Sequence, residues 1–351
     1  MKVTIEKEAV TIAHKDLQEL VCRLLGKVGV PEKDAATVAE VMVNADLKGV
    51  ESHGVRWLDI YLKRIMAGCV KPVTDSKVIR EKAGFLLLDA GSGLGQVAMS
   101  KAIQMGIAKA KNAGICVAAV CNSNHFGAAG YYTELATKAN MAAMVMTNST
   151  PLMAPWGGVT PSIGTNPISF GFPAKGEPVI LDMATSASAR GKVFIAAQKG
   201  TKLPDGVALN KAGEPTTDAK EALEGILLPA AGPKGYGLSL VIDIMAGIMT
   251  GSNFGQNITS LYGDLEHTQD IGHFALIINI DDFLPLDDYL AKMQRSRDEL
   301  TGSKLAKGFS RIFLPGEIEA NLAKQRKEQG VVIPFATWNT LQEWAAKLNI
   351  Q

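Results

Sequence analysis

The sequence predicts a mixed α/β protein with a central sheet and a helical domain built from both ends of the chain. Three observations support this fold class. Apolar residues recur at helical spacing up to about residue 80, short aliphatic runs between helical stretches follow, and charged helical segments return after residue 285. Because 351 residues exceed the usual size of one hydrophobic core, we expect two domains. The helical domain is predicted at 1–80 and 290–351, and the central domain at 81–289.

Helical periodicity is clearest near the N-terminus. In residues 15–27, apolar side chains recur every three or four positions: Leu17, Leu20, Val21, Leu24 and Leu25. Residues 31–49 begin with Pro31, which the start of a helix tolerates, and end at a glycine, so they predict a second helix. A third is predicted at about 54–67. We therefore expect the first eighty residues to be helical.

Five short β-branched or aliphatic runs predict buried strands in the middle of the chain. They are GFLLLDA, ICVAAVCN, MAAMVMTN, PVILDMA and HFALIIN. Residues 149–178 are rich in glycine and proline, which indicates a long loop, and loops of this length in compact domains are usually functional. The charged segments after residue 285 predict further helices.

Composition excludes several classes of protein. The 36 basic and 35 acidic side chains nearly cancel, so bulk electrostatics would not recruit nucleic acid. The longest apolar run, LSLVIDIMAGIMTG, contains an aspartate and is too short to span a bilayer. The four cysteines (Cys22, Cys69, Cys116 and Cys121) lie in apolar surroundings without C-x-x-C spacing, and the first sixteen residues lack a secretory pattern. We expect reduced cysteines and a cytoplasmic protein.

Residues 86–106, LLLDAGSGLGQVAMSKAIQMG, look like the strand, glycine turn and helix that open a Rossmann unit. Gly91 and Gly93 fit the first two places of that fingerprint, but Gln96 stands at the third. The next predicted strand ends in Asn122 and lacks the carboxylate that would hold a ribose. A strand-turn-helix connection needs glycines for steric reasons alone. We interpret this stretch as scaffold and not as a dinucleotide site.

Two of the five histidines are candidates for chemistry. His125 follows a predicted buried strand, and histidine is the side chain best suited to move a proton near neutral pH. The alternative is a capping or core histidine. His53 lies three residues before Arg56, whose guanidinium could hold a carboxylate in two parallel hydrogen bonds. Here the alternative is a solvated helix start with a surface arginine.

Lys234, in LPAAGPKGYGLSL, lies at a predicted helix start where backbone N–H groups and the ammonium could face a phosphate. A Schiff-base lysine or a structural turn are the alternatives. The sequence contains no G-x-S-x-G, no H-E-x-x-H and no cysteine-histidine cluster with zinc spacing. We therefore expect no metal site.

Six collinear stretches resemble a known family: ADLKGVESHG, NSNHFGAAGYY, IGTNPISFGFP, LDMATS, LPAAGPKGYGL and LPGE. The chain resembles the malate/L-lactate dehydrogenase family that is unrelated to the Rossmann-type lactate dehydrogenases, from about residue 14 to residue 345. That family includes ureidoglycolate, malate and sulfolactate dehydrogenases and reductases of diketogulonate and cyclic imino acids. The resemblance implies a mixed-sheet NAD(P)-binding domain of non-Rossmann type. It also implies a homodimer with active sites near the subunit interface.

The resemblance further implies roles for individual residues. His125 would transfer the proton, and His53 would be a second active-site histidine. Cofactor contacts would fall on Ser149, Asp182, Met183, Ala184, Lys234, Gly235, Gly316 and Glu317, and substrate contacts on Thr165 and Asn166. Many relatives carry a substrate-binding arginine four residues after the histidine of S-H-G. This chain has Trp57 there and its arginine one position earlier, at Arg56.

Residues and resemblance together predict hydride transfer between a nicotinamide and C2 of a small 2-hydroxy acid. His125 would take the hydroxyl proton, Arg56 and His53 would hold the carboxylate, and Lys234 would face the cofactor phosphates. We expect NAD, with NADP left open, and ureidoglycolate, malate, lactate and sulfolactate remain alternative substrates. Other hypotheses are a reductase of the same family, a lyase or aldolase using Lys234, and a catalytically silent oligomeric binding protein.

Overall fold

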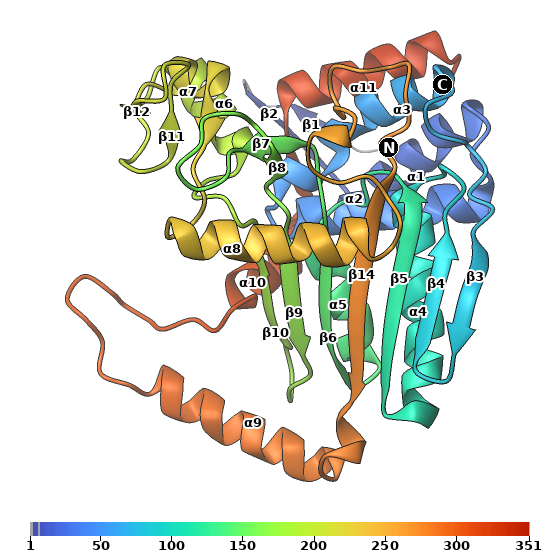
Figure 1. Ribbon diagram of the computed structural model, residues 1–351, viewed down its shortest axis with the longest axis vertical. Helices are drawn as coiled ribbons and strands as arrows, with labels where there is room; N and C mark the ends of the chain where they lie inside the picture. The colour runs from blue at the N-terminus through green and yellow to red at the C-terminus, as the bar shows by residue number, and fades with distance from the viewer. Residues whose placement is uncertain (1–2, 6–7, 351) are drawn as a thin grey trace.

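The computed structural model describes residues 3–5 and 8–350, and a seven-stranded mixed sheet forms its centre (Figure 1). The strand order is β10-β9-β6-β14-β5-β4-β3, and only the β4–β5 pair is parallel. The strands are β3 Lys77–Lys82, β4 Phe85–Asp89, β5 Ile115–Ser123, β6 Met141–Thr147, β9 Ile168–Phe172, β10 Val179–Met183 and β14 Ile271–Asn279. All five predicted strands lie in this sheet, which confirms the fold class.

Both faces of the central strands are buried, whereas the edge strand β3 is exposed along its length. Successive side chains of a strand point to opposite faces, and Val145 and Ala275 enter one core, whereas their neighbours Met146 and Phe274 enter another. Helices α4 (Gly95–Ala113) and α5 (Ala129–Lys138) cover the first face, and α8 (Pro233–Ile242), continued by a π-helical turn at Asp243–Ile248, covers the second. Because helices pack on both faces, successive side chains of these strands are mostly apolar, and their sequences contain continuous apolar runs.

The two ends of the chain share a separate core. Its helices are α1 His14–Lys27, α2 Glu32–Leu47, α3 Leu58–Met66, α10 Glu317–Gln329 and α11 Phe335–Lys347. Buried residues of this core include Leu24 and Leu58 from the N-terminal part and Trp338 and Trp344 from the C-terminal part. The predicted helices are confirmed with small shifts, since Pro31 caps α2 and a 3-10 turn at Val55–Trp57 precedes α3. The division of the chain at residues 80 and 290 remains a proposal.

The expectation that the first eighty residues are purely helical is wrong. Strands β1 (Val3–Ile5) and β2 (Ala9–Ile12) form a three-stranded sheet with β15 (Val331–Pro334), and β3 is the edge of the central sheet. Each strand near the terminus has only three or four residues, too few for periodicity to show. Strand β1 pairs only with β2, whereas β2 also pairs with β15, more than three hundred positions away, so long-range pairing contributes to this small sheet.

The loop predicted at 149–178 is also wrong in part, because β9 and the short strands β7 (Pro151–Met153) and β8 (Ile163–Gly164) lie within it. Strand β9 carries Ser169 and Gly171, which obscure the apolar pattern. Tertiary contacts explain both residues. The Ser169 hydroxyl bonds Thr133 at 2.9 Å, and a β-carbon at Gly171 would lie 2.8 Å from the side chain of Thr133. The polar and small residues let α5 pack closely on the sheet.

A small lobe and a projecting helix complete the fold (Figure 1). The lobe has its own core and a five-stranded sheet, β12-β11-β13-β7-β8, flanked by α6 (Arg190–Lys199) and α7 (Ala219–Glu224). Its other strands are β11 Ala208–Leu209, β12 Pro215–Thr216 and β13 Ile226–Leu227. Helix α9 (Leu286–Thr301) has no buried residue and lies along one edge of the molecule. Within residues 3–5 and 8–350, no helix has the length and apolar character needed to cross a membrane.

The packing of the π-helical turn on the sheet generates a stability prediction. A β-carbon at Gly272 in β14 would lie 1.7 Å from the backbone oxygen of Ala246. Backbone cannot yield as a flexible side chain does, so Gly272→Ala should lower the free energy of unfolding by about 3 kcal/mol, the upper end for overpacking. Urea denaturation measures the change. The control is Gly26→Ala in α1, where the added carbon meets nothing within 4 Å and should cost no stability.

Candidate active site

A cavity of about 330 Å³ opens next to the sheet, and both candidate histidines line it. The loop before α3, the residues after β5 and β6, the end of β10, the start of α6 and the segment 261–271 supply its wall. Seven of the sequence-predicted residues line it: His53, His125, Ser149, Thr165, Asp182, Met183 and Ala184. The fold therefore brings together residues that are more than a hundred positions apart.

His125 lies in the loop between β5 and α5, half-buried, and its ring is fixed on one side. The Tyr61 hydroxyl is 2.5 Å from His125 Nδ1, and the Gly127 amide donates to the same atom at 3.4 Å. The His125 amide donates to Gln269 Oε1 at 3.0 Å. Because Nδ1 is engaged, Nε2 is the ring nitrogen that a substrate can reach. Burial lowers the pKa of His125 to about 3, so the imidazole is neutral at physiological pH.

His53 lies in the 3-10 turn Glu51–His53, and its ring stacks near that of His125 with the ring centroids 5.8 Å apart. Burial, with Arg56 as a second cause, lowers the pKa of His53 to about 4. Asp46 of α2 stabilises the residues that follow this turn, because its carboxylate accepts the Val55 amide at 2.8 Å. Gly54 is required here, because a β-carbon would overlap the Asp46 carboxylate. Both histidines can therefore present neutral rings to one ligand.

The Arg56–Trp57 pair is arranged differently from a simple carboxylate clamp. Trp57 lines the cavity, its ring packs on Tyr262 with centroids 4.9 Å apart, and its indole N–H donates to the Ser52 carbonyl. Arg56 is not among the residues that line this cavity; its guanidinium lies over the Trp57 ring at 5.2 Å, and its Nη1 is 3.9 Å from where a β-carbon of Gly191 would lie. The cations in the cavity wall are Arg190 and Lys192, from the first turn of α6.

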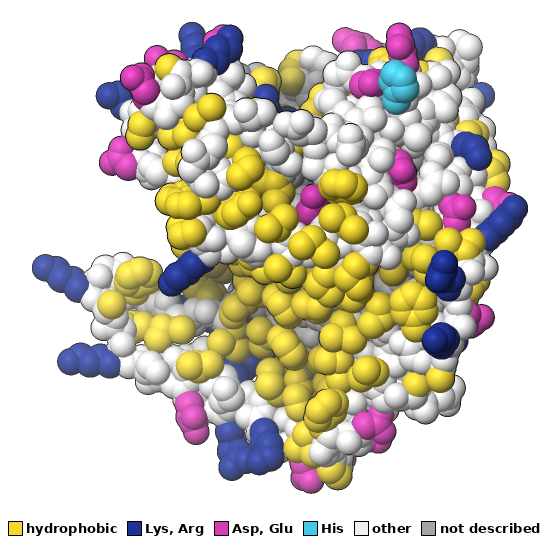
Figure 2. Space-filling view, viewed as in Figure 1, with side chains coloured by type: hydrophobic (Ala, Val, Ile, Leu, Met, Phe, Trp, Pro, Cys, Tyr) yellow, Lys and Arg dark blue, Asp and Glu magenta, His cyan; other side chains and the backbone are white. Residues whose placement is uncertain are grey.

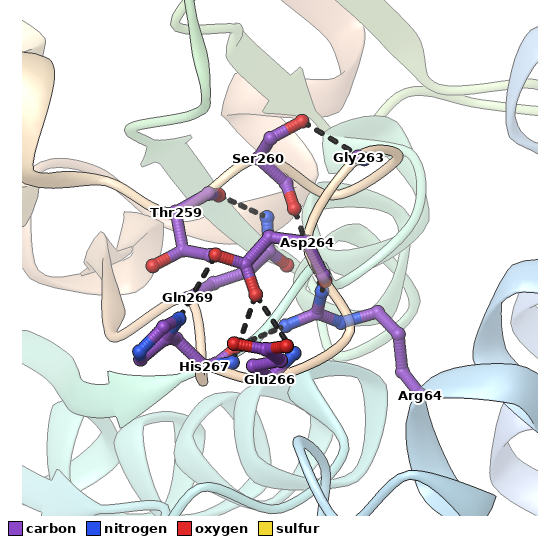
Figure 3. A network of polar contacts seen from close by, with 8 residues as sticks. All are labelled: Arg64, Thr259, Ser260, Gly263, Asp264, Glu266, His267 and Gln269. Carbon is purple, nitrogen blue, oxygen red and sulfur yellow. Dashed lines mark hydrogen bonds and ion pairs between the residues drawn. The ribbon is translucent and has the colours of Figure 1, made fainter.

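Sequence reasoning missed Tyr61, Trp57, Tyr262, Gln269, Arg190 and Lys192 as site residues. Arg190 and Lys192 follow LDMATS by only a few positions, so proximity to that stretch could have indicated them. Tyr262 and Gln269 lie in a loop that carries none of the six family stretches. That loop is held by Arg64 of α3, which is fully buried and donates to the carbonyls of Ser260, Asp264 and His267 (Figure 3).

A second cavity of about 290 Å³ adjoins the first. Val50, Ala128 and Asp182 line both, so the two form neighbouring parts of one groove. The Asp182 carboxylate is open to the groove and accepts the Gly130 amide at the start of α5 at 2.8 Å, while burial raises its pKa to about 6. Gly316 lines the second cavity at φ +85°, and a β-carbon there would lie 2.9 Å from the Ile180 carbonyl. An elongated dinucleotide fits such a divided groove.

Four sequence-predicted residues lie outside both cavities, in addition to Arg56. Asn166 is fully buried and joins two segments, because Oδ1 accepts the Ser149 amide and Nδ2 donates to the Ser239 carbonyl, both at 3.0 Å. Gly235 lets the first turn of α8 pack on Ala230, and the neighbouring Lys234 is exposed. Glu317 pairs with Arg311 and accepts the Leu314 amide at 3.1 Å. In the described part of the chain, no three His, Cys, Asp or Glu side chains gather as a metal site would need.

Comparison with known proteins agrees with this arrangement. The family model for malate/L-lactate dehydrogenase matches residues 12–342. L-Sulfolactate dehydrogenase from Methanocaldococcus jannaschii is 40% identical over 95% of this chain and 96% of its own length, and malate dehydrogenase from Pyrococcus abyssi is 38% identical over 99% and 97%. The solved structure of the Methanocaldococcus enzyme superposes with a TM-score of 0.92 at 39% identity, covering 97% of this chain and 98% of that one.

Further relatives are named by their cofactor. Ureidoglycolate dehydrogenase (NAD(+)) from Escherichia coli K12 is 34% identical over 90% of both chains. (2R)-3-Sulfolactate dehydrogenase (NADP(+)) from Chromohalobacter salexigens is 32% identical over 95% of this chain and 98% of its own. These relatives are dehydrogenases of hydroxy acids, and the resemblance seen in the sequence is confirmed. The chain belongs to the malate/L-lactate dehydrogenase family and is an oxidoreductase of the 2-hydroxy acid type.

Proposed function

We propose that this enzyme transfers a hydride between C2 of a 2-hydroxy acid and the nicotinamide of NAD(P), with His125 moving the hydroxyl proton. The observation that carries the proposal is the neutral imidazole of His125 in the cavity wall, with Nδ1 held by Tyr61 and Nε2 available. A neutral ring can accept the proton of the C2 hydroxyl as the hydride leaves C2. The cofactor supplies the hydride acceptor, and the protein supplies the proton acceptor and the orientation of both reactants.

We propose that the start of α6 binds the acidic end of the substrate. Arg190 and Lys192 line the cavity, whereas Arg56 is not among its lining residues and has its guanidinium over the Trp57 ring. Cations near free backbone N–H groups at a helix start favour an anion. Two cations also suit a substrate with a second anionic group next to C2. Malate and sulfolactate have that shape, and the relatives at 38% and 40% identity carry their names.

The groove supports NAD more than NADP. Ser149 and Asp182–Ala184 would contact the cofactor in the first cavity, and Gly316 in the second. The Asp182 carboxylate can accept hydrogen bonds from ribose hydroxyls. Two of the three lysines that line the second cavity already have partners, since Lys48 lies 2.5 Å from Glu134 and Lys324 lies 2.8 Å from Glu177, and Lys327 is the third. Neutralised cations favour a ribose with free hydroxyls over one with an additional phosphate.

We also propose a homodimer. Helix α8 and the π-helical turn expose an apolar face, defined by Leu238, Leu240, Val241, Ile244, Ile248 and Met249. The central apolar band of Figure 2 lies over this part of the molecule. A contiguous apolar face of this kind usually marks an interface with another protein. A second copy of this chain is the partner that the family resemblance supports.

The lyase hypothesis receives no support from the placement of Lys234. A Schiff-base lysine needs access to a substrate cavity and a partly desolvated amine. Lys234 is exposed at the start of α8 and lines neither cavity. The His125 cavity therefore carries the proposed chemistry.

Replacement of His125 tests the proposed proton transfer. His125→Gln should lower kcat at least about a hundredfold, because the proton acceptor is lost. It should leave NADH binding, followed by quenching of tryptophan fluorescence, within a few-fold of the wild type. His14→Gln is the control, since His14 lies at the start of α1 and lines neither cavity. Near-normal turnover of the His125 variant would show that another group moves the proton.

The role of α6 is tested with two substrates of different charge. Arg190→Gln and Lys192→Gln should each raise KM for oxaloacetate about tenfold, the effect of one charge-assisted hydrogen bond. KM for pyruvate should rise less in at least one of the two variants, because pyruvate has a single carboxylate and needs only one of the two cations. Arg56→Gln is the matched control and should change both KM values less. If Arg56→Gln has the largest effect, the carboxylate lies against the loop before α3 instead.

The dimer is tested on the apolar face. The wild type should have the mass of two chains in size-exclusion chromatography with light scattering. Ile244→Glu should shift the mass to one chain, because a buried charge without a partner opposes association. Ile79→Glu is the control, since Ile79 is equally an exposed hydrophobic residue but lies on the edge strand β3. A wild-type monomer would contradict the proposal.

A further inference from the structure

The glycine turn at residues 91–95, which looks like a Rossmann fingerprint, contacts the loop that carries His125. A β-carbon at Gly95 would lie 2.0 Å from the Asn124 carbonyl and 2.8 Å from the His125 carbonyl. The Asn124 side chain donates to the carbonyls of Ser92 and Gly93 at 3.1 and 3.0 Å. The turn follows β4 and the catalytic loop follows β5, its parallel neighbour. The glycines therefore permit two backbone segments to touch, and the residue after Gly95 is brought close to the active site.

That residue is Gln96, which is fully buried. Neither of its amide atoms makes a hydrogen bond of ordinary geometry to any residue that the structure describes. The polar group beside the amide is the Tyr61 hydroxyl, because Gln96 opposes the rise that burial gives the Tyr61 pKa. A buried amide without a good partner costs free energy. Its place beside Tyr61 therefore requires an explanation beyond packing.

We propose that Tyr61 and Gln96 are positioning residues that let His125 exchange between its two neutral tautomers. The inference rests on the proposed function, because it assumes that His125 moves the proton. It follows from the 2.5 Å between the Tyr61 hydroxyl and His125 Nδ1 and from the buried amide of Gln96, which has no hydrogen-bond partner of its own in the described part of the chain. A hydroxyl can donate one hydrogen bond and accept others, so it can serve either tautomer.

Oxidation of the substrate requires a lone pair on Nε2. In that state Nδ1–H donates to the Tyr61 oxygen, and the Tyr61 proton turns toward Gln96 Oε1. The C2 hydroxyl proton then passes to Nε2 while the C2–H bond breaks, its electron pair leaves as hydride to the nicotinamide and the C2=O bond forms. The ring becomes imidazolium and keeps its Nδ1–H bond to Tyr61. The proton on Nε2 returns to bulk solvent after the product leaves.

The other tautomer carries its proton on Nε2. Nδ1 then accepts from the Tyr61 hydroxyl and, more weakly, from the Gly127 amide at 3.4 Å. The phenol only rotates and stays protonated, since burial raises the pKa of Tyr61 well above its usual range. The other titratable rings around His125 are His53 and His273. His273 is held between Ser123 and Thr147, both at 2.8 Å, so it takes no part in the exchange.

A double-mutant cycle tests this chain of contacts. Tyr61→Phe should lower kcat/KM for oxidation about tenfold, the size of one ordinary hydrogen bond, and equally for reduction, since both directions share one transition state. Gln96→Met should lower it several-fold. If Gln96 acts through Tyr61, Gln96→Met has no further effect when it is combined with Tyr61→Phe. Gln96→Glu, which keeps an acceptor oxygen when protonated, should retain most activity and serves if the methionine variant does not fold.

The pH profile separates positioning from a merely structural role. The Tyr61 oxygen accepts Nδ1–H of the imidazolium, so its loss destabilises the protonated ring and lowers the pKa. The acidic limb of kcat/KM for oxidation should therefore move to lower pH in Tyr61→Phe, by up to about one unit. Tyr132→Phe is the matched control, because its buried hydroxyl donates to the Phe126 carbonyl and does not touch His125. Its acidic limb should stay in place.

Two outcomes would overturn the inference. One is additive effects of Tyr61→Phe and Gln96→Met on kcat/KM, and the other is an unmoved acidic limb in Tyr61→Phe. The failure of the proposed function is distinguishable from both, because it would appear as near-normal turnover in His125→Gln. If His125→Gln abolishes turnover while Tyr61→Phe behaves as the wild type, only the tautomer exchange is refuted.

Discussion

The position of His125 depends on the parallel pairing of β4 with β5, next to the edge strand β3 of an otherwise antiparallel sheet. The carboxyl ends of parallel strands leave the sheet at the same edge. The turn after β4 and the loop after β5 therefore meet. Their backbones can touch because Gly95 has no side chain. Helix α3 belongs to the terminal core and makes two further contacts. Its Tyr61 hydroxyl bonds the ring of His125, and its Arg64 donates to the loop that carries Gln269, which in turn accepts the His125 amide. Three separate parts of the chain thus fix one imidazole.

Burial sets the charge state of this site. Both His53 and His125 are desolvated, which lowers their pKa values and keeps them neutral. The opposite holds for two carboxyls, since desolvation raises the pKa of the buried Asp46 to about 7 and that of Asp182, which is exposed in the groove, to about 6. The positive charge of the cavity wall is supplied by Arg190 and Lys192. A site of neutral rings with cations on one wall suits an anion that must give up a proton from an uncharged hydroxyl.

The sequence was sufficient for elements whose signal is local. The five buried strands, the helices of both ends and the histidine after β5 follow from periodicity, turn residues and chemistry. Strands β1, β2 and β9 could not be predicted in this way, because short length or tight packing against α5 removes their pattern. The same holds for Tyr262 and Gln269, which enter the site only through the Arg64 clamp on their loop. Gln96 was visible as a departure from the glycine fingerprint, but its partner Tyr61 was not.

The small lobe has a hydrophobic core of its own, and α6 belongs to it. The residues that hold His125 belong to the central and terminal cores, so the proton transfer and the anion binding that we propose would be built on different parts of the protein. Substitutions in the lobe can therefore reshape the substrate end of the cavity without disturbing the imidazole. This modularity offers a physical reason why one scaffold serves relatives named for malate, sulfolactate and ureidoglycolate. New specificities can evolve on the lobe while the proton-transfer machinery is inherited unchanged.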